Sequence, residues 1–392
     1  MEGSVRRAGQ KLRVSAQLTD VTRGFVIWSQ TFDGDAGDVF KFQDQIAGAV
    51  ANALREHFTV SPTPETAEFA HGTENVKAFD LYMRGRYYWN KRGAENLRTA
   101  IAYFDAALKE DPTFARAYSG LAIAHALLPE YSNASMQESF EETERAARRA
   151  LELDSGLAEA HTALGLAYIH AWRRDEAVRE YREAIRLEPR YPTAHQWLGE
   201  YWYEVGQIDS SLAHMRMSVS LDPLAPINAS AMGHPLMLAG RYDEAIKELR
   251  EGVAAHPLLG IHHSVLSYAY FGKGDIPSAI REAEIASKLD SSVALRRGQL
   301  GVIYGAGGYR DKAEQMLREL KSRPGPVSPY TMALAYIGVG DIDSAFREMD
   351  RAISMKDPVL ASWSMPKDPV LRSLRTDPRW KTLLQRMNLP NI

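Results

Sequence analysis

Small, apolar and proline positions return along the chain at one fixed spacing. Prolines stand at Pro189, Pro223 and Pro257, each 34 residues after the last. Before each proline, at constant distances, lie an apolar–glycine pair and then a small, a large apolar and a second small residue. These positions are Leu164, Gly165, Ala177, Tyr181 and Ala184; Leu198, Gly199, Ser211, Met215 and Ser218; and Met232, Gly233, Ala245, Leu249 and Gly252. A period of this length predicts a repeat architecture.

The pattern within one period predicts a pair of antiparallel helices. Glycine and the small residues let two backbones approach closely, and the large apolar residue fills the space between the helices. Gly206, Gly240 and Gly274 mark the turn inside each pair, because glycine is a helix-stop signal. The proline lies between pairs, where its missing N–H costs little.

These units resemble the tetratricopeptide repeat. Four of them tile without gaps, and four less regular ones complete a set of eight. The regular units are 158–191, 192–225, 226–259 and 260–293, and the others are 78–112, 115–155, 294–323 and 326–359. The resemblance implies a mostly α fold, a right-handed α-solenoid of about eight helix pairs over residues 78–359. Residues 360–392 are expected to form a capping segment and helix, because the last repeat of a solenoid otherwise exposes an apolar face.

The first 60 residues follow a different pattern. Residues 12–32 alternate apolar and polar positions in two runs, which predicts a β-hairpin. A helix follows, with Asp38 as its expected N-cap. This stretch resembles the end of the TolB-like domain found in bacterial signalling proteins. Residues 1–60 are therefore interpreted as a truncated α/β remnant, and residues 61–77 as a linker.

In that family the domain is commonly preceded by an adenylate-cyclase, kinase or CadC-type winged-helix domain, none of which this sequence contains. A two-stranded hairpin is marginal alone and leaves backbone groups unpaired along its edges. Residues 1–35 are expected either to pair with another copy of the chain, as a homodimer through the hairpin, or to be loosely ordered.

Composition narrows the class of function. The net charge is −3, so the chain lacks the basic excess that neutralises phosphates, and nucleic-acid binding is not expected. No run of about 18 or more apolar residues appears, so no membrane insertion is expected. The absence of cysteine excludes disulfides, thiolate metal sites and cysteine nucleophiles. We expect a cytoplasmic location, with the periplasm as the alternative if the parent protein carries an upstream membrane anchor.

The sequence contains no constellation typical of catalysis. His161, His195 and His263 share one position in the first helix of their repeats, where the family packs a bulky residue, so a satisfied interhelical histidine is expected at each. They lie a full repeat apart, roughly 10 Å, too far to share one metal ion. The glycine-rich segment 301–312 lacks the lysine–hydroxyl pair of a phosphate loop. We expect no enzyme, no catalytic residue, no cofactor and no metal.

The candidate site is the concave groove, which in this family is lined by the first helix of each repeat. Its later part is apolar and aromatic in this sequence. The candidate peptide-binding residues are Tyr203, Ile227, Met237, Ile261, Tyr268, Phe271, Leu295, Val302, Tyr330, Leu334 and Ile337. Two alternatives stay open. These side chains form an exposed apolar groove that binds a partner, or some of them pack internally or under the cap.

Two hypotheses for the function follow. The first is a non-enzymatic scaffold that binds a protein or peptide in its concave groove, as part of a bacterial signalling or regulatory protein. An amphipathic helix or an extended apolar peptide would suit such a groove. The alternative is an intramolecular regulatory or sensory module of a longer cyclase, kinase or transcriptional regulator, from which this chain is a fragment.

Overall fold

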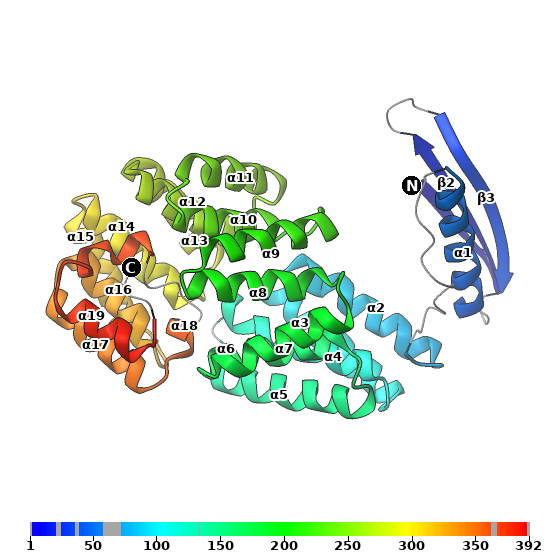
Figure 1. The fold of residues 1–392 in the computed structure, drawn as a ribbon, viewed down its shortest axis with the longest axis horizontal. Helices are drawn as coiled ribbons and strands as arrows, with labels where there is room; N and C mark the ends of the chain where they lie inside the picture. Colours follow the sequence, from blue (N-terminus) through cyan, green and yellow to red (C-terminus); the bar gives the residue numbers. More distant parts are fainter. Residues whose placement is uncertain are drawn as a thin grey trace.

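The structure is a computed structural model that describes residues 2–20, 25–35, 39–57, 72–132, 134–361 and 367–389. Figure 1 shows a small sheet with one helix at the N-terminus and a long array of helices that makes up the rest of the chain. The expected N-cap Asp38 and most of the expected linker 61–77 lie outside the described residues.

The helical part is a series of consecutive antiparallel pairs. The pairs are α2 (Val76–Lys91) with α3 (Ala94–Glu110), α4 (Ala115–Tyr131) with α5 (Met136–Leu153), α6 (Ala158–His170) with α7 (Arg174–Leu187), α8 (Pro192–Glu204) with α9 (Ile208–Leu221), α10 (Asn228–Leu238) with α11 (Tyr242–Ala255), α12 (Gly260–Lys273) with α13 (Ile276–Leu289), α14 (Ala294–Ala306) with α15 (Arg310–Ser322), and α16 (Pro329–Val339) with α17 (Ile342–Ser354). The prediction of a mostly α solenoid behind a small α/β part is confirmed for the described residues.

Within a pair, the glycine of the first helix faces the large residue of the second. A Cβ on Gly165 would lie 2.3 Å from the Tyr181 ring, and a Cβ on Gly233 would lie 2.6 Å from the Leu249 side chain. Tyr181 and Leu249 are almost fully buried. The repeated glycine therefore sets the close approach of the two helices, because any side chain there would displace the residue that fills the space.

Each of the regular pairs turns at a residue with a left-handed backbone. Gly206, Gly240 and Gly274 take φ values of 81°, 74° and 92° at this position. In the pair α6–α7 the turn contains Trp172 instead, with φ 62°. A left-handed conformation costs a non-glycine residue roughly 1–2 kcal/mol. Other contacts must hold Trp172 in place, since such strain persists only where the surroundings compensate for it.

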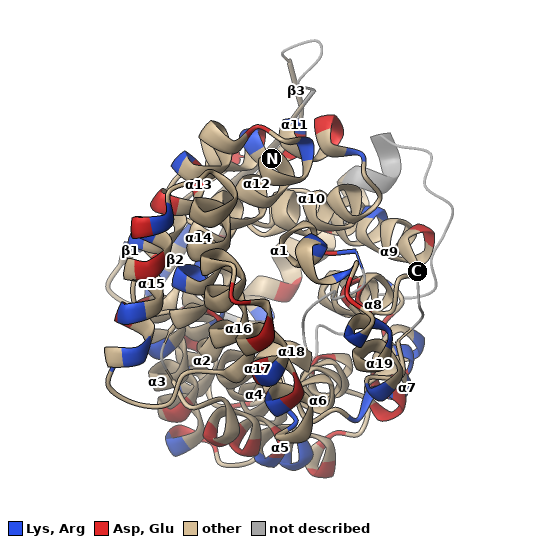
Figure 2. Ribbon diagram, turned by 90° about the vertical axis from the view of Figure 1, so that its left-hand side faces the viewer, with Lys and Arg blue, Asp and Glu red and all other residues tan. Residues whose placement is uncertain are grey.

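Those contacts come from the far end of the solenoid, which curves back onto α6. The short helix α18 (Pro358–Ala361), which follows α17, packs against α6. Figure 2 shows the helices arranged as a ring, with α18 beside α6. The Trp172 indole Nε1 donates to the Asp357 carbonyl oxygen at 3.2 Å, and Arg174 Nη2 donates to the Ala361 carbonyl oxygen at 3.3 Å.

The last segment has two parts with different neighbours. A 3₁₀ turn, η2 (Pro369–Leu374), packs on the inner helices α12, α14 and α16. The final helix, α19 (Arg379–Arg386), packs on α17, where Arg379 pairs with Asp343 at 2.8 Å and Arg386 pairs with Asp350. Trp380 on α19 is only 4% exposed. The structure thus places an amphipathic helix over the last repeat.

The N-terminal part is an antiparallel sheet in the order β1 (Glu2–Ala8), β2 (Lys11–Asp20), β3 (Phe25–Asp35), with α1 (Val39–His57) beside β3. Its small core consists of Ala16, Phe32 and Phe42. The expected hairpin is present as β2 and β3, but β1 pairs along the edge of β2 that was expected to be bare. Sequence pattern missed β1 because Val5 is its only large apolar residue and every β1 residue is exposed. The homodimer prediction stays a prediction, and it now concerns the outer edge of β1.

Over the part of the chain that the structure describes, every helix is too short or too polar to cross a membrane.

Candidate functional site

The candidate groove residues fall into two groups. Seven are buried in the core of the later repeats, away from a pocket on the inner side of the solenoid, each at most 9% exposed: Met237, Tyr268, Phe271, Val302, Tyr330, Leu334 and Ile337. An eighth, Tyr203, is 8% exposed in the same core cluster and also lines the pocket. The other three line the pocket as well: Ile227, Ile261 and Leu295. Of the two alternatives that the sequence left open, internal packing applies to the seven.

The chain's own C-terminal segment covers the apolar part of the inner face. Val370, Leu371 and Leu374 of η2 are at most 2% exposed and belong to the same core cluster as the seven candidate residues. The Arg372 guanidinium lies 5.7 Å from the centre of the Phe271 ring, within cation–π range. The aromatic and aliphatic lining expected of a peptide groove is present, and a short apolar segment occupies it.

Two copies of one pentapeptide make these inner contacts. The sequence Lys-Asp-Pro-Val-Leu stands at 356–360 and again at 367–371. In both copies the aspartate caps the turn: Asp357 Oδ1 and Asp368 Oδ1 each accept a hydrogen bond at 3.0 Å from the backbone N–H two residues on. The first copy leads into α18 on α6, and the second leads into η2 on α12, α14 and α16. A search for short identical words would have found this duplication, which the longer repeat period conceals.

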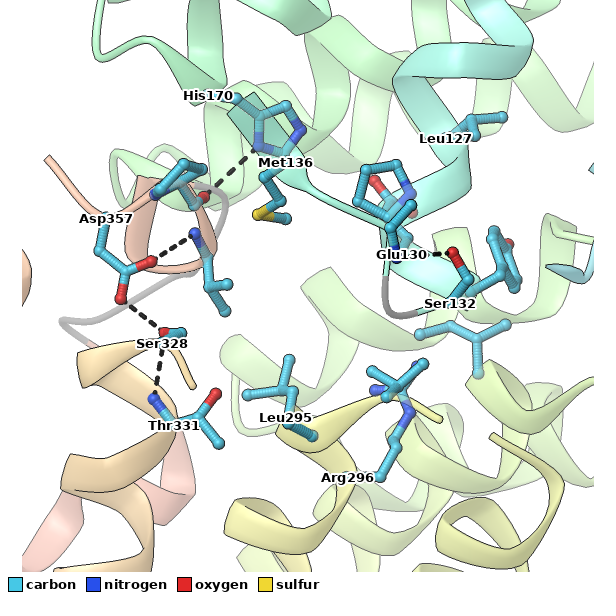
Figure 3. A pocket seen from close by; sticks show the side chains of 18 of the residues that line it. Leu127, Glu130, Ser132, Met136, His170, Leu295, Arg296, Ser328, Thr331 and Asp357 are labelled. Atoms are coloured by element: carbon cyan, nitrogen blue, oxygen red, sulfur yellow. Dashed lines mark hydrogen bonds between the residues drawn. The ribbon is translucent and has the colours of Figure 1, made fainter. Parts of the chain in front are cut away.

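The inner face also surrounds a pocket of about 640 Å³. Its walls come from the C-terminal end of α4, from the inner helices α8, α10 and α14, from segment 323–329, and from the start of α18. In Figure 3, Glu130 and Arg296 approach the pocket from one side, and His170 and Asp357 approach it from another. The pocket therefore joins residues from repeats that are far apart in the sequence.

Three glutamates line this pocket. Glu130 lies in the last turn of α4, and Glu200 and Glu204 lie one turn apart on α8. Burial and the nearby charge of Glu200 raise the pKa of Glu130 to about 7. Burial raises the pKa of Glu200 to about 7 and the pKa of Glu204 to about 8. The Glu130 side chain is exposed, although protein surrounds the pocket that it lines, whereas Glu204 is 5% exposed.

Three buried polar atoms at the pocket have no hydrogen-bond partner among the described residues: Arg92 Nη1, Glu204 Oε2 and Ser230 Oγ. Each side chain belongs to a residue that is at most 6% exposed. Arg92 also has a left-handed backbone, with φ 56°, and its guanidinium lies 4.3 Å from the Trp89 ring centre. A buried polar atom left without a partner costs about 1–3 kcal/mol. Such atoms at a pocket wall indicate that water or a ligand completes their hydrogen bonding.

Two histidines at the pocket are neutral at pH 7. Burial lowers the pKa of His170 and of His234 to about 4. The His234 ring stacks on Tyr203 with centroids 5.0 Å apart, and the His170 ring stacks on Phe140 at 4.2 Å. These rings add flat, uncharged surface to a wall whose charge comes from carboxylates and guanidinium groups.

The repeat histidines lie between helices, as the sequence predicts. His161 Nδ1 lies 2.6 Å from Glu180 Oε2, and His263 Nδ1 lies 2.7 Å from Glu282 Oε2. His195 Nδ1 lies 3.1 Å from His214 Nδ1. In each case the partner belongs to the second helix of the same pair, so the prediction of satisfied interhelical histidines is confirmed. Across the described residues, no group of three or more histidine, aspartate or glutamate side chains is arranged to hold a metal ion.

Comparison with known proteins identifies the repeats. Models of the tetratricopeptide repeat match residues 158–191, 82–135 and 231–294. A curated relative, putative adenylate cyclase 3 of Rhizobium meliloti (strain 1021), is 29% identical over 180 residues, which is 45% of this chain and 30% of that protein. The chain therefore spans less than a third of that relative's length.

A solved structure shares the fold over most of the chain at low identity. The human IFIT1 dimer with m7Gppp-AAAA matches 90% of this chain and 86% of its own, with a TM-score of 0.54 and 16% identity. A thermophilic TPR protein of Thermus thermophilus matches 53% of this chain and 98% of its own, with a TM-score of 0.39 and 18% identity.

Proposed function

The chain carries tetratricopeptide repeats, and on that premise we propose that it is a non-enzymatic scaffold whose inner face binds a short segment of a protein. The segment would be an apolar turn with an aspartate at its start. One observation carries the proposal: the inner face of α12, α14 and α16 holds such a segment from the chain itself, η2, with Leu371 and Leu374 buried.

The chemistry of the segment supports this choice of partner. Asp368 caps the first backbone N–H groups of the turn, and Pro369 starts the turn with its φ already set. Val370 and Leu371 then supply the apolar surface that is buried. A partner segment with the same order of residues would meet the same side chains. Its affinity would come mainly from burial of two or three aliphatic groups, each contributing about 1.5–3 kcal/mol before ordering costs.

The wider role that we propose is the interaction part of a bacterial signalling or regulatory protein. The relative named as a putative adenylate cyclase favours this context, and the chain matches only 30% of its length. The alternative is an intramolecular module that binds a segment of its own parent protein. Both roles use the same inner face, and neither places a catalytic step in this chain.

A labelled peptide of residues 366–376 tests the proposal on the full chain. In the wild type the tethered segment acts at an effective concentration of order millimolar, so the added peptide should not bind measurably. Leu371→Asp releases the tethered segment, because a charge in place of a fully buried leucine is strongly unfavourable. The peptide should then bind with a Kd in the micromolar range, read by fluorescence anisotropy.

Leu224→Asp is the matched control, because Leu224 is 86% exposed and the charge change is the same. Like the wild type, it should not bind the added peptide measurably. Circular dichroism checks that Leu371→Asp stays helical, and Leu371→Ala replaces it if it does not. The proposal fails if the peptide binds none of the folded variants, or binds Leu224→Asp as well as it binds Leu371→Asp.

A further inference from the structure

The pocket on the inner face has features of a ligand site that the binding of a protein segment does not use. We propose that it binds a small aliphatic cation, a molecule with one or more protonated amines on a hydrocarbon chain. The carboxylates of Glu130, Glu200 and Glu204 receive the amines, and the apolar wall receives the chain. This proposal is independent of the peptide-binding role, because η2 lies outside the lining of the pocket.

The carboxylates without a cationic partner, rather than the overall balance of charge, favour a cation at the pocket. Four arginines and four carboxylates line it, but most are already engaged. Arg296 pairs with Asp290 at 3.1 Å, Arg351 pairs with Glu348, and the guanidinium of Arg323 donates to the Ser292 carbonyl oxygen. Asp357 accepts bonds from the Ser328 hydroxyl and the backbone N–H of Tyr330 and Val359.

The three glutamates are different, because none of them forms an ion pair among the described residues of the pocket. Glu200 accepts one bond from Gln196 Nε2 at 2.8 Å. Glu204 Oε2 is buried with no partner. A protonated amine carries three hydrogen-bond donors and one positive charge. It can therefore both hydrogen-bond to these carboxylates and neutralise their charge, whereas a neutral molecule can do only the first.

Arg92 and Ser230 supply a second, separate sign of a ligand. Both are at least nine-tenths buried, line the pocket and hold a polar atom without a partner. Arg92 does so from a left-handed backbone, and strain of this kind is concentrated at functional positions. A hydroxyl or carboxylate on the ligand would satisfy Arg92 Nη1, whereas a ligand without one would leave a water there.

The rest of the wall suits a hydrocarbon chain. Leu127, Trp197, Ile227, Ile261 and Leu295 line the pocket with apolar surface. The volume of about 640 Å³ lies within the range of small-molecule sites. Glu130 is exposed and Glu200 is half-buried, so these two side chains are within reach of a solute, whereas Glu204 is only 5% exposed. An amine is favoured over a metal ion, because the described residues contain no group arranged for metal ligation.

The titration of the site predicts its dependence on pH. Around the glutamates stand Arg92 from the end of α2, Arg174 at the start of α7, and Arg296 on α14, which favour the charged carboxylates. Tyr203 on α8 and the neutral His234 on α10 carry no charge at pH 7. The glutamate pKa values are about 7 to 8. An amine therefore binds best at a pH above that range, and at a lower pH its binding must displace protons from the glutamates. Affinity should rise from pH 6 to pH 8, by at most about tenfold per pH unit for each proton displaced.

Isothermal titration calorimetry on the full chain, in about 0.15 M salt to screen surface charge, tests the site. The probes are butylamine, putrescine and spermidine, with 1,4-butanediol as the uncharged control. At least one amine should bind saturably with one site, tighter at pH 8 than at pH 6, while the diol should not bind. The heat at pH 7 should change with the ionisation enthalpy of the buffer, because binding displaces protons.

Glu204→Gln should weaken amine binding at least tenfold, and Glu251→Gln, an exposed position on α11, should leave it unchanged. Circular dichroism verifies that each variant is folded, and Glu200→Gln serves as a second pocket variant. The proposal is overturned if no amine binds below about 10 mM, or if Glu204→Gln, Glu200→Gln and Glu251→Gln all bind as the wild type does. Equal binding of butanediol and putrescine would also overturn it.

Discussion

Glycines in α14 allow this helix to lie almost in backbone contact with α16, and one of them offers a sharp test of that packing. A Cβ added to Gly305 would lie 1.9 Å from the Gly338 carbonyl oxygen on α16. A Cβ added to Gly301, one turn earlier on α14, would meet only Met316 Cβ at 3.6 Å and Ala335 Cα at 3.9 Å, which are ordinary contacts. Gly305→Ala and Gly301→Ala therefore compare the same chemical change with and without a clash.

The added methyl group affects stability in two ways that have opposite signs: it favours the helix, and it can clash with α16. Replacing glycine by alanine in a helix stabilises it by roughly 0.5–1 kcal/mol, and Gly301→Ala should show this gain. Gly305→Ala has the same gain, but α14 and α16 must move apart by roughly 1 Å, and overpacking of this kind costs about 1–3 kcal/mol. We expect Gly301→Ala to raise the free energy of unfolding by up to about 1 kcal/mol and Gly305→Ala to lower it by about 1–2 kcal/mol.

Urea unfolding followed by circular dichroism measures both changes as shifts of the midpoint. Hydrogen exchange adds a local readout. Since α14 and α16 form the surface under η2, moving them apart should speed amide exchange in residues 369–374 in Gly305→Ala and leave it unchanged in Gly301→Ala. If Gly305→Ala is as stable as Gly301→Ala, the close approach of the two helices does not exist in solution, and the packing argument is wrong.

Two further changes test the closed ring and the interhelical histidines. Trp172→Gly relieves a left-handed backbone but removes the hydrogen bond to the Asp357 carbonyl oxygen. Small-angle scattering should therefore show a larger radius of gyration. An unchanged radius would mean that this contact does not hold the ring closed. Burial lowers the pKa of His263, but the hydrogen bonds to Glu282 and the Pro257 carbonyl oxygen, together with the charges of Glu282 and Asp290, raise the pKa above 6.5. The pair therefore stabilises the fold below pH 6.5 and loses this effect as pH rises through the higher value. The stability difference between wild type and His263→Gln should be larger at about pH 5.5 than at about pH 8.5 in urea titrations, and a difference that grows with pH would contradict this assignment.

The helix pairs could be predicted from the sequence because their determinants are local. The contact of Gly165 with Tyr181, and the matching contact of Gly233 with Leu249, each lie within one repeat. The hydrogen bond between His161 and Glu180, and the equivalent contacts of His195 and His263, also join the two helices of one pair. In a solenoid each repeat contacts mainly its neighbours, so a pattern repeated at a fixed period specifies most of the stacking.

Strand β1 shows where local pattern is not enough. Its residues are all exposed, and only Val5 among them is large and apolar. Nothing in the alternation of these residues predicts a strand. The pairing with β2 supplies it, through backbone hydrogen bonds that do not depend on side-chain type.

The candidate site was decided by the tertiary structure. The repeat pattern predicts which helix of each pair faces inward, and four of the residues predicted in this way line the pocket: Tyr203, Ile227, Ile261 and Leu295. The pattern does not predict that η2 packs on the inner face. The curvature of a solenoid sums small rotations from every repeat, and here it brings Asp357 to Trp172, 185 residues away in the chain. That closure buries the apolar half of the inner face under the chain's own segment and gathers Glu130, Glu200 and Glu204 into one space. A repeat motif determines which side chains face inward, whereas the sum of the rotations determines which of them meet, because contacts across the ring join repeats that are not neighbours in sequence.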